Sequence, residues 1–213
     1  MIKIFNKIKN LDKNDKTMLL FIFITIGNII IATIKFIFSI ILPSLWFFVN
    51  AGFLIVLCIS RFFSLKSYGK RRSILDIKIK QELGYKNYLN NGILLIILGI
   101  MYFFVSVYMY YKGTNTQMHE YLTYLVAFNA FWQIGFAIHG MVKYKRKDDP
   151  ILNSVKITNF ANALTSIVLT QVVLLDTYAS EYNLSDVNGY TGMLVSIIII
   201  LLGLYMIISI KKD

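Results

Sequence analysis

The side chains that could do chemistry in this sequence are a few polar residues set inside long apolar segments. Four hydroxyl and amide side chains in the stretch 156–176 are spaced so that they share one face of a helix. Polar groups are costly in hydrocarbon, so this face is predicted to point into a helix bundle. Such a face either hydrogen-bonds to neighbouring helices or lines a path for a polar solute. The four residues are Thr158, Asn162, Thr165 and Ser166.

Lys35 and Asn50 are polar residues within the first two apolar segments. About 12 Å of helix separates Lys35 from the end of its segment, so its long side chain can snorkel to the outer interface. A pair with Asp176 and direct contact with a solute are two other interpretations. Asn129 and Gln133, spaced four residues apart, share a helix face that suits interhelical hydrogen bonds or a polar lining.

The central parts of the apolar segments contain no carboxylate. A path for cations normally needs carboxylates or rings of carbonyls, and a proton relay needs Asp, Glu or His in series. An intramembrane hydrolase needs a nucleophile with a base, or a metal with its ligands. The single cysteine, Cys58, supplies neither an internal disulfide nor a metal cluster. We therefore expect no enzymatic activity, no metal site and no cofactor.

Six apolar segments must position these side chains. Each is close to the roughly 20 residues that cross a hydrocarbon core as a helix, and unpaired backbone groups in lipid require them to be helical. With 57% hydrophobic residues in 213, the chain is predicted to be an all-α integral membrane protein. We expect a basic tail at 1–17, a six-helix transmembrane domain at 18–210 and a short end at 211–213. The segments are 18–42, 44–64, 89–111, 120–142, 156–176 and 189–210.

The basic residues predict the orientation of the segments. The six predicted segments cross the membrane in alternating directions, so every second connecting region lies on the same side. The regions on one side contain all of the 22 Lys and Arg residues except Lys35 and Lys112. The positive-inside rule then puts both termini in the cytosol, as expected for a multi-pass protein of the cell membrane. The net charge of +11 suits contact with the lipid bilayer, and we expect no nucleic-acid partner. These regions are 1–17, 61–88, 143–156 and 211–213.

The spacing of Asn28, Lys35, Ser44 and Asn50 resembles the start of the cation diffusion facilitator family of metal efflux proteins. The resemblance implies a six-helix bundle with both termini in the cytosol, efflux of a metal ion in exchange for protons, and a homodimer. It extends over residues 20–210 through further similar positions. These are Tyr88, Gly92, Gly99, the run Asn162 to Ser166, and the run Asn188 to Gly192.

The chain departs from that family at the metal site. The resemblance places the metal ligands of the family at Phe53, Leu57, Thr158 and Asn162, where no carboxylate or imidazole is present. Neutral oxygen and amide groups do not balance a desolvated divalent ion. Because the sequence ends at Asp213, we also expect the cytosolic metal-binding domain of the family to be missing. The chain therefore resembles a degenerate member without the metal ligands.

Two functions remain open on the sequence. The first is a transporter-like protein that moves a solute or ion other than a desolvated divalent metal. The second is a non-transporting structural or regulatory membrane protein that acts through a membrane protein partner. The polar stripe of 156–176 favours the first, because helix packing alone rarely needs four polar residues on one face. The predicted pathway consists of Asn50, Thr158, Asn162, Thr165 and Lys35.

Overall fold

Six long helices form the computed structural model of the chain, which describes residues 13–41, 45–113, 120–143, 149–179 and 185–210. All six are long and apolar enough to cross a membrane, and the described residues contain no strand. The prediction of an all-helical, multi-pass membrane protein is confirmed to this extent. The helices are α2 (Lys13–Ile41), α3 (Leu45–Arg72), α4 (Ile77–Lys112), α5 (Glu120–Lys143), α6 (Pro150–Tyr178) and α7 (Ser185–Ile210).

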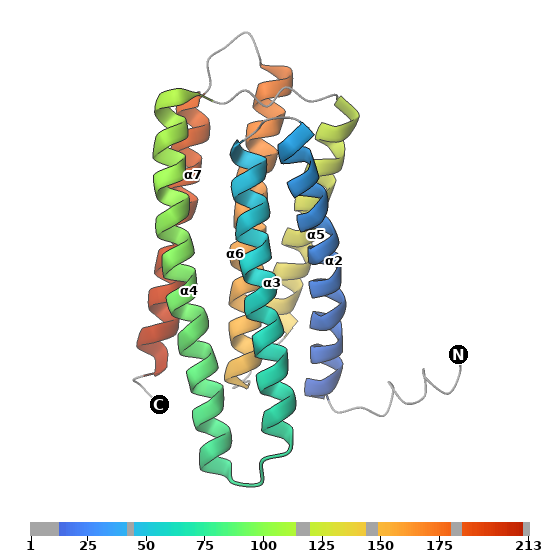
Figure 1. The fold of residues 1–213 in the computed structure, drawn as a ribbon, viewed down its shortest axis with the longest axis vertical. Coiled ribbons are helices and arrows are strands. Elements are labelled where there is room, and N and C mark those ends of the chain that lie inside the picture. The colour runs from blue at the N-terminus through green and yellow to red at the C-terminus, as the bar shows by residue number, and fades with distance from the viewer. Residues whose placement is uncertain (1–12, 42–44, 114–119, 144–148, 180–184, 211–213) are drawn as a thin grey trace, which may run out of the picture.

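The helices run up and down, with α6 and α3 in the middle of the bundle (Figure 1). α4 and α7 pack together on one side, while α2 packs mainly against α3 and α5 mainly against α6. The start of α2, the turn between α3 and α4, and the end of α7 lie at the same end of the bundle (Figure 1). Most of the predicted basic tail, the end at 211–213 and Ser44 lie outside the described residues.

Two helices, α3 and α4, extend well beyond the predicted apolar segments. The stretch between the predicted segments 44–64 and 89–111 is helical except for a short turn before Ile77. Hydropathy marks only the part of a helix that matches lipid, and Lys, Gln and Glu are good helix formers that continue the helix into water. Asp76 caps α4, since its carboxylate accepts a hydrogen bond from the Lys78 backbone N–H at 2.8 Å.

Glycines bring the α4 and α7 backbones into close contact. A Cβ atom built on Gly203 would lie 2.7 Å from the backbone oxygen of Gly92, and one on Gly99 would lie 2.7 Å from Ile200 Cγ1. Small residues at a helix interface permit this approach, which is the usual basis of helix association in membranes. The glycines that the sequence resemblance singled out on α4 therefore have a packing role here.

A buried polar network joins α3, α4 and α6 in the half of the bundle nearest the α3–α4 turn. Asn91 Nδ2 donates to Ser64 Oγ at 3.2 Å and to the Asn87 backbone oxygen at 2.9 Å. Ser60 donates to Asn91 Oδ1, and Ser154 Oγ donates to Asn87 Oδ1 at 3.3 Å. Because these groups satisfy one another, the network holds the three helices in register at little desolvation cost.

An ion pair closes the same end of the bundle. Arg71 on α3 pairs with Asp149, which also caps α6 by accepting a hydrogen bond from the Ile151 backbone N–H at 3.0 Å. Gly84 on α4 lies beside this pair, and a Cβ there would come within 3.4 Å of Arg71 Nη1. The start of α6 is thus fixed to α3 next to α4.

Candidate functional site

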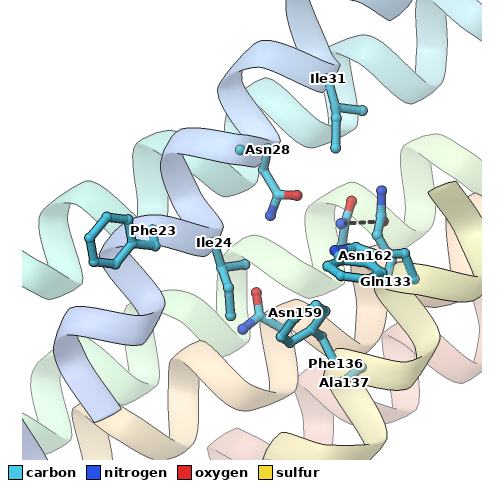
Figure 2. A pocket seen from close by; sticks show the side chains of 11 residues that line it. Phe23, Ile24, Asn28, Ile31, Gln133, Phe136, Ala137, Asn159 and Asn162 are labelled. Carbon is cyan, nitrogen blue, oxygen red and sulfur yellow. Dashed lines mark hydrogen bonds between the residues drawn. The ribbon is translucent and has the colours of Figure 1, made fainter. Parts of the chain in front are cut away.

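A cavity of about 240 Å³ lies between α2 on one side and α5 and α6 on the other. Four amide side chains line it, with Asn28 from α2 and Gln133 from α5, and with Asn159 and Asn162 from α6. Figure 2 shows these amides pointing into one space together with apolar side chains. The remaining lining residues are Phe23, Ile24, Gly27, Ile31, Trp132, Phe136 and Ala137.

Gln133 organises the polar side of the cavity. Its Oε1 atom accepts hydrogen bonds from Asn162 Nδ2 at 2.7 Å and from Ser166 Oγ at 2.8 Å, the first of which is drawn in Figure 2. The Gln133 Nε2 donor and the Asn159 Oδ1 acceptor are buried, and neither has a hydrogen-bond partner within the described part of the chain. The amides that line the cavity therefore carry one donor and one acceptor that remain unsatisfied within the described residues.

The cavity lies where two helix pairs meet. α2 is packed onto α3 and α5 onto α6, so the space between them separates the two pairs. Phe23 on α2 is 69% exposed and Trp132 on α5 is 56% exposed, although both line the cavity. The cavity therefore reaches the outer surface of the bundle at these two aromatic side chains.

The predicted polar stripe of α6 does face the bundle interior, as expected, but only one of its residues lines the cavity. Thr158, Asn162, Thr165 and Ser166 are all buried. Thr158 Oγ1 donates to the Val155 backbone oxygen at 2.9 Å, and Thr165 Oγ1 donates to the Asn162 backbone oxygen at 3.0 Å. Both hydroxyls are thus satisfied by their own helix, and Asn162 is the predicted residue that lines the cavity.

Asn50 and Lys35 are buried elsewhere in the bundle. Asn50 Nδ2 donates to the Trp46 backbone oxygen at 3.0 Å. The Asn50 side chain lies close to Tyr102, but neither Asn50 Oδ1 nor the Tyr102 hydroxyl has a hydrogen-bond partner within the described residues. Lys35 is 5% exposed, so its side chain does not snorkel into the surroundings. The described residues place no carboxylate within ion-pair distance of Lys35, and Asp176 instead accepts a hydrogen bond from Asn188 at 3.5 Å.

Sequence reasoning did not identify three of the amides as parts of one site. Gln133 was noted for its spacing from Asn129, Asn28 as a polar residue of the first segment and through the family resemblance, and Asn159 only as one of the polar residues of 156–176. The shared signal was available, since each is an amide inside an apolar segment. Their convergence depends on how the three helices rotate about their axes, which the one-dimensional pattern does not specify.

The positions at which the resemblance places metal ligands do not form a metal site. The Phe53 ring packs edge-on against Tyr102 with centroids 5.9 Å apart, and Leu57 lies in the apolar core. The described residues contain no group of three or more His, Cys, Asp or Glu side chains that could hold a metal ion. What the cavity offers instead is neutral hydrogen-bonding groups in an apolar wall, a combination typical of small-molecule sites.

Comparison with known proteins adds no relative. No protein-family model matches the sequence, and no curated protein matches it. The likeness to cation diffusion facilitators therefore rests on residue spacing alone.

Proposed function

We propose that this polytopic membrane protein is a transporter-like relative of the cation diffusion facilitators that binds a small solute in the amide-lined cavity between α2, α5 and α6. The observation that carries the proposal is the cavity itself, where Gln133 Nε2 and Asn159 Oδ1 remain unsatisfied. Buried polar groups are normally hydrogen-bonded, so a site of this kind favours a ligand or ordered water that completes them.

The chemistry of the lining argues against a desolvated divalent metal. The four lining amides are neutral, and divalent ions in proteins are normally bound by carboxylates, imidazoles or thiolates. Removing a divalent ion from water without compensating charge is very costly. A neutral polar solute, an anion or a weakly held monovalent cation fits this lining better.

The seam between the helix pairs supports a role in transport. A site at a seam between helices is exposed to alternate sides when one side of the seam moves against the other. α2 packs mainly on α3 and α5 mainly on α6, and contacts between α3 and α6 join the two pairs. The movement that would open and close this cavity is therefore one of α2 relative to α5, with α3 and α6 held together.

The proposed orientation has both termini in the cytosol of a cell-membrane protein. The basic regions of the sequence flank the helix ends that gather at one end of the bundle (Figure 1), and the positive-inside rule assigns that end to the cytosol. A homodimer follows from the family resemblance alone, and we include it in the proposal on that basis.

The second candidate function is a non-transporting structural or regulatory protein that acts through a membrane protein partner. It is favoured by the hydrogen bonds that Thr158 and Thr165 make to their own helix, and by the Gln133 contacts with Asn162 and Ser166. These interactions make much of the stripe a means of joining α5 to α6 rather than a path.

Flux into liposomes that contain the purified protein tests the proposal. We would measure uptake of zinc, manganese and iron(II), of small neutral solutes by osmotic swelling, and of monovalent ions, each with and without a pH gradient. Asn159→Leu replaces an unbonded amide by an apolar side chain of similar size, so flux should fall while folding is retained. Asn129→Leu, an equivalent change on α5 outside the cavity lining, is the matched control.

The expected result is protein-dependent flux of a solute other than these metals, reduced by Asn159→Leu and unchanged by Asn129→Leu. Flux of zinc, manganese or iron(II) would contradict the argument from the ligands. If no solute of any class moved, transport would be refuted and the partner-dependent function would take its place.

A further inference from the structure

The buried charge of the bundle has a single sign. Three cationic side chains are buried, Lys35, Arg61 and Lys156, whereas no Asp or Glu among the described residues is buried. Lys156 has interaction partners, among them Asn153, whose Oδ1 accepts a hydrogen bond from Lys156 Nζ at 3.3 Å. The helix interior is therefore electrostatically positive, and a buried charge inside a membrane protein normally has a functional partner.

Arg61 is the most isolated of these cations. Its side chain is 1% exposed, and none of its three guanidinium nitrogens has a hydrogen-bond partner within the described residues. Arg71, on the same helix, shows the contrasting case, because it is paired with Asp149. A guanidinium carries five N–H donors and stays protonated. Among the described residues, Arg61 has neither a hydrogen-bond acceptor nor a paired carboxylate.

Packing on either side of Arg61 locates it in the bundle. Toward one end, Cys58 packs against Ala32 of α2. Toward the other, Leu65 packs against a cluster that includes Phe21 of α2 and Val155 of α6. Arg61 follows Cys58 and precedes Leu65 on α3, so it lies between these two contacts.

The amides of the cavity lie in the same layer of the bundle as Arg61, meaning at a similar position along the helix axes. Asn28 lies between Phe21 and Ala32 on α2, and Asn159 is one helical turn beyond Val155 on α6. Arg61 does not itself line the cavity, but it lies in the layer of the bundle that contains the amides. Lys35 follows Asn28 by two turns along the buried face of α2.

We infer that the solute of the cavity is a small monovalent anion, attracted by the buried Arg61 guanidinium and hydrogen-bonded by Gln133 Nε2. This inference rests on the proposed function and specifies its substrate class. A cation in the same cavity would be repelled by the three buried positive charges, whereas an anion would be stabilised by them. A volume of about 240 Å³ suits a small inorganic anion or a small carboxylate with a few water molecules.

The effect of Arg61 on affinity follows from Coulomb's law. Neighbouring packed helices lie about 8–10 Å apart. At that separation and an effective dielectric constant of about 20, removing one positive charge should weaken anion binding roughly 15- to 35-fold. An exposed lysine on the same helix is separated from the cavity by solvent or lipid headgroups, so its removal should change affinity far less.

Anion-dependent ion flux tests the inference on the full-length protein in zwitterionic phosphatidylcholine liposomes. Without anionic lipid, a lipid headgroup cannot serve as the anion. We would impose chloride, nitrate and formate gradients against gluconate at constant ionic strength, and record the diffusion potential and the concentration dependence of uptake. The variants are Arg61→Gln, Arg61→Lys, and Lys66→Gln as a control at an exposed position of α3.

We expect the wild-type diffusion potential to follow the small anion, and Arg61→Gln to raise the half-saturating concentration roughly 15- to 35-fold. Arg61→Lys should retain most of the affinity, and Lys66→Gln should match the wild type. An equal affinity in Arg61→Gln would overturn the inference. A wild-type potential that follows potassium would also overturn it, whether or not the variants fold.

The transporter-like function and the anion as its substrate can be refuted separately. Flux of a neutral solute that depends on Asn159 but shows no response to any anion would refute the anion and leave the transporter-like function in place. If no free anion moved in phosphatidylcholine liposomes and added anionic lipid bound to the protein in an Arg61-dependent manner, a lipid headgroup would be the ligand and the free anion would be refuted. The absence of flux for every solute would refute the function itself.

Discussion

The contact between α4 and α7 makes a quantitative prediction about Gly203. In Gly203→Ala, the new Cβ would lie 2.7 Å from the Gly92 backbone oxygen and 2.7 Å from Ile96 Cγ1. Ordinary contacts between such atoms are about 3.5–4.0 Å, so the helices must separate by several tenths of an ångström. The nearest obstacle is backbone, which a change of side-chain rotamer does not move.

The stability lost through overpacking in Gly203→Ala is obtained by comparison with Gly135→Ala on α5. A Cβ on Gly135 meets nothing within 4 Å, so this variant isolates the gain in helix propensity of about 1 kcal/mol. Gly203→Ala makes the same gain and adds an overpacking cost of about 1–3 kcal/mol. The difference between the variants therefore equals the overpacking cost, and it corresponds to roughly 2–12 °C in melting temperature for a chain of this size.

Thermal unfolding of both variants in the same detergent measures this difference. Loss of the folded species is followed by size-exclusion chromatography after heating, with the wild type in parallel. We expect Gly135→Ala to melt above the wild type, and Gly203→Ala to melt at or below the wild type and clearly below Gly135→Ala. Equal melting temperatures for the two variants would refute the close approach of α4 and α7.

Three further predictions concern the site and the end of the bundle. Gln133→Leu removes the acceptor shared by Asn162 and Ser166 and leaves two buried donors unpaired, so it should cost about 1–3 kcal/mol in thermal unfolding; an unchanged melting temperature would show that these hydrogen bonds do not stabilise the bundle. Asp149→Ala removes the α6 cap and the partner of Arg71; it should cost about 1 kcal/mol from the cap and more than the roughly 1 kcal/mol of an exposed ion pair, because both side chains are largely buried and Arg71 is left unpaired. The unfolding free energy of this variant should depend less on salt concentration than that of the wild type. A stronger salt dependence in the variant would contradict the pairing. Zinc should leave the melting temperature unchanged, because a ligand stabilises only by binding the native state; a zinc-dependent rise abolished by Asn162→Ala would contradict this.

The sequence was sufficient to predict the number and type of the helices, because an apolar run of membrane length has few other structures available to it. It was less informative about where helices end. The residues between the predicted segment 44–64 and Ile77 are polar enough to leave the lipid, yet most of them continue α3. Solvation and helix formation are separate properties, and hydropathy reports only the first.

The residues that line the cavity were predictable only in part, because a sequence pattern does not show how each helix is rotated against its neighbours. The stripe on α6 could be recognised because four polar residues share a face, and Asn162 indeed lines the cavity. Thr158 and Thr165 were placed in the same pathway, but hydroxyls in helices readily bond to the carbonyl of the preceding turn. Asn159 lies outside the stripe, and it faces the cavity only because α2 and α5 are positioned beside that side of α6.

The length of α4 has a mechanical consequence. Its 36 residues span about 54 Å, and a hydrocarbon core of about 30 Å would contain them only at a tilt of about 56°, beyond the roughly 40° that membrane helices reach. A rigid stem of α3 and α4 therefore stands clear of the lipid, with Leu75 almost fully exposed at its tip. Such a stem acts as a lever: a 24 Å arm turned by about 5° moves its tip by about 2 Å, so rearrangements inside the membrane would be amplified into displacements measurable in water.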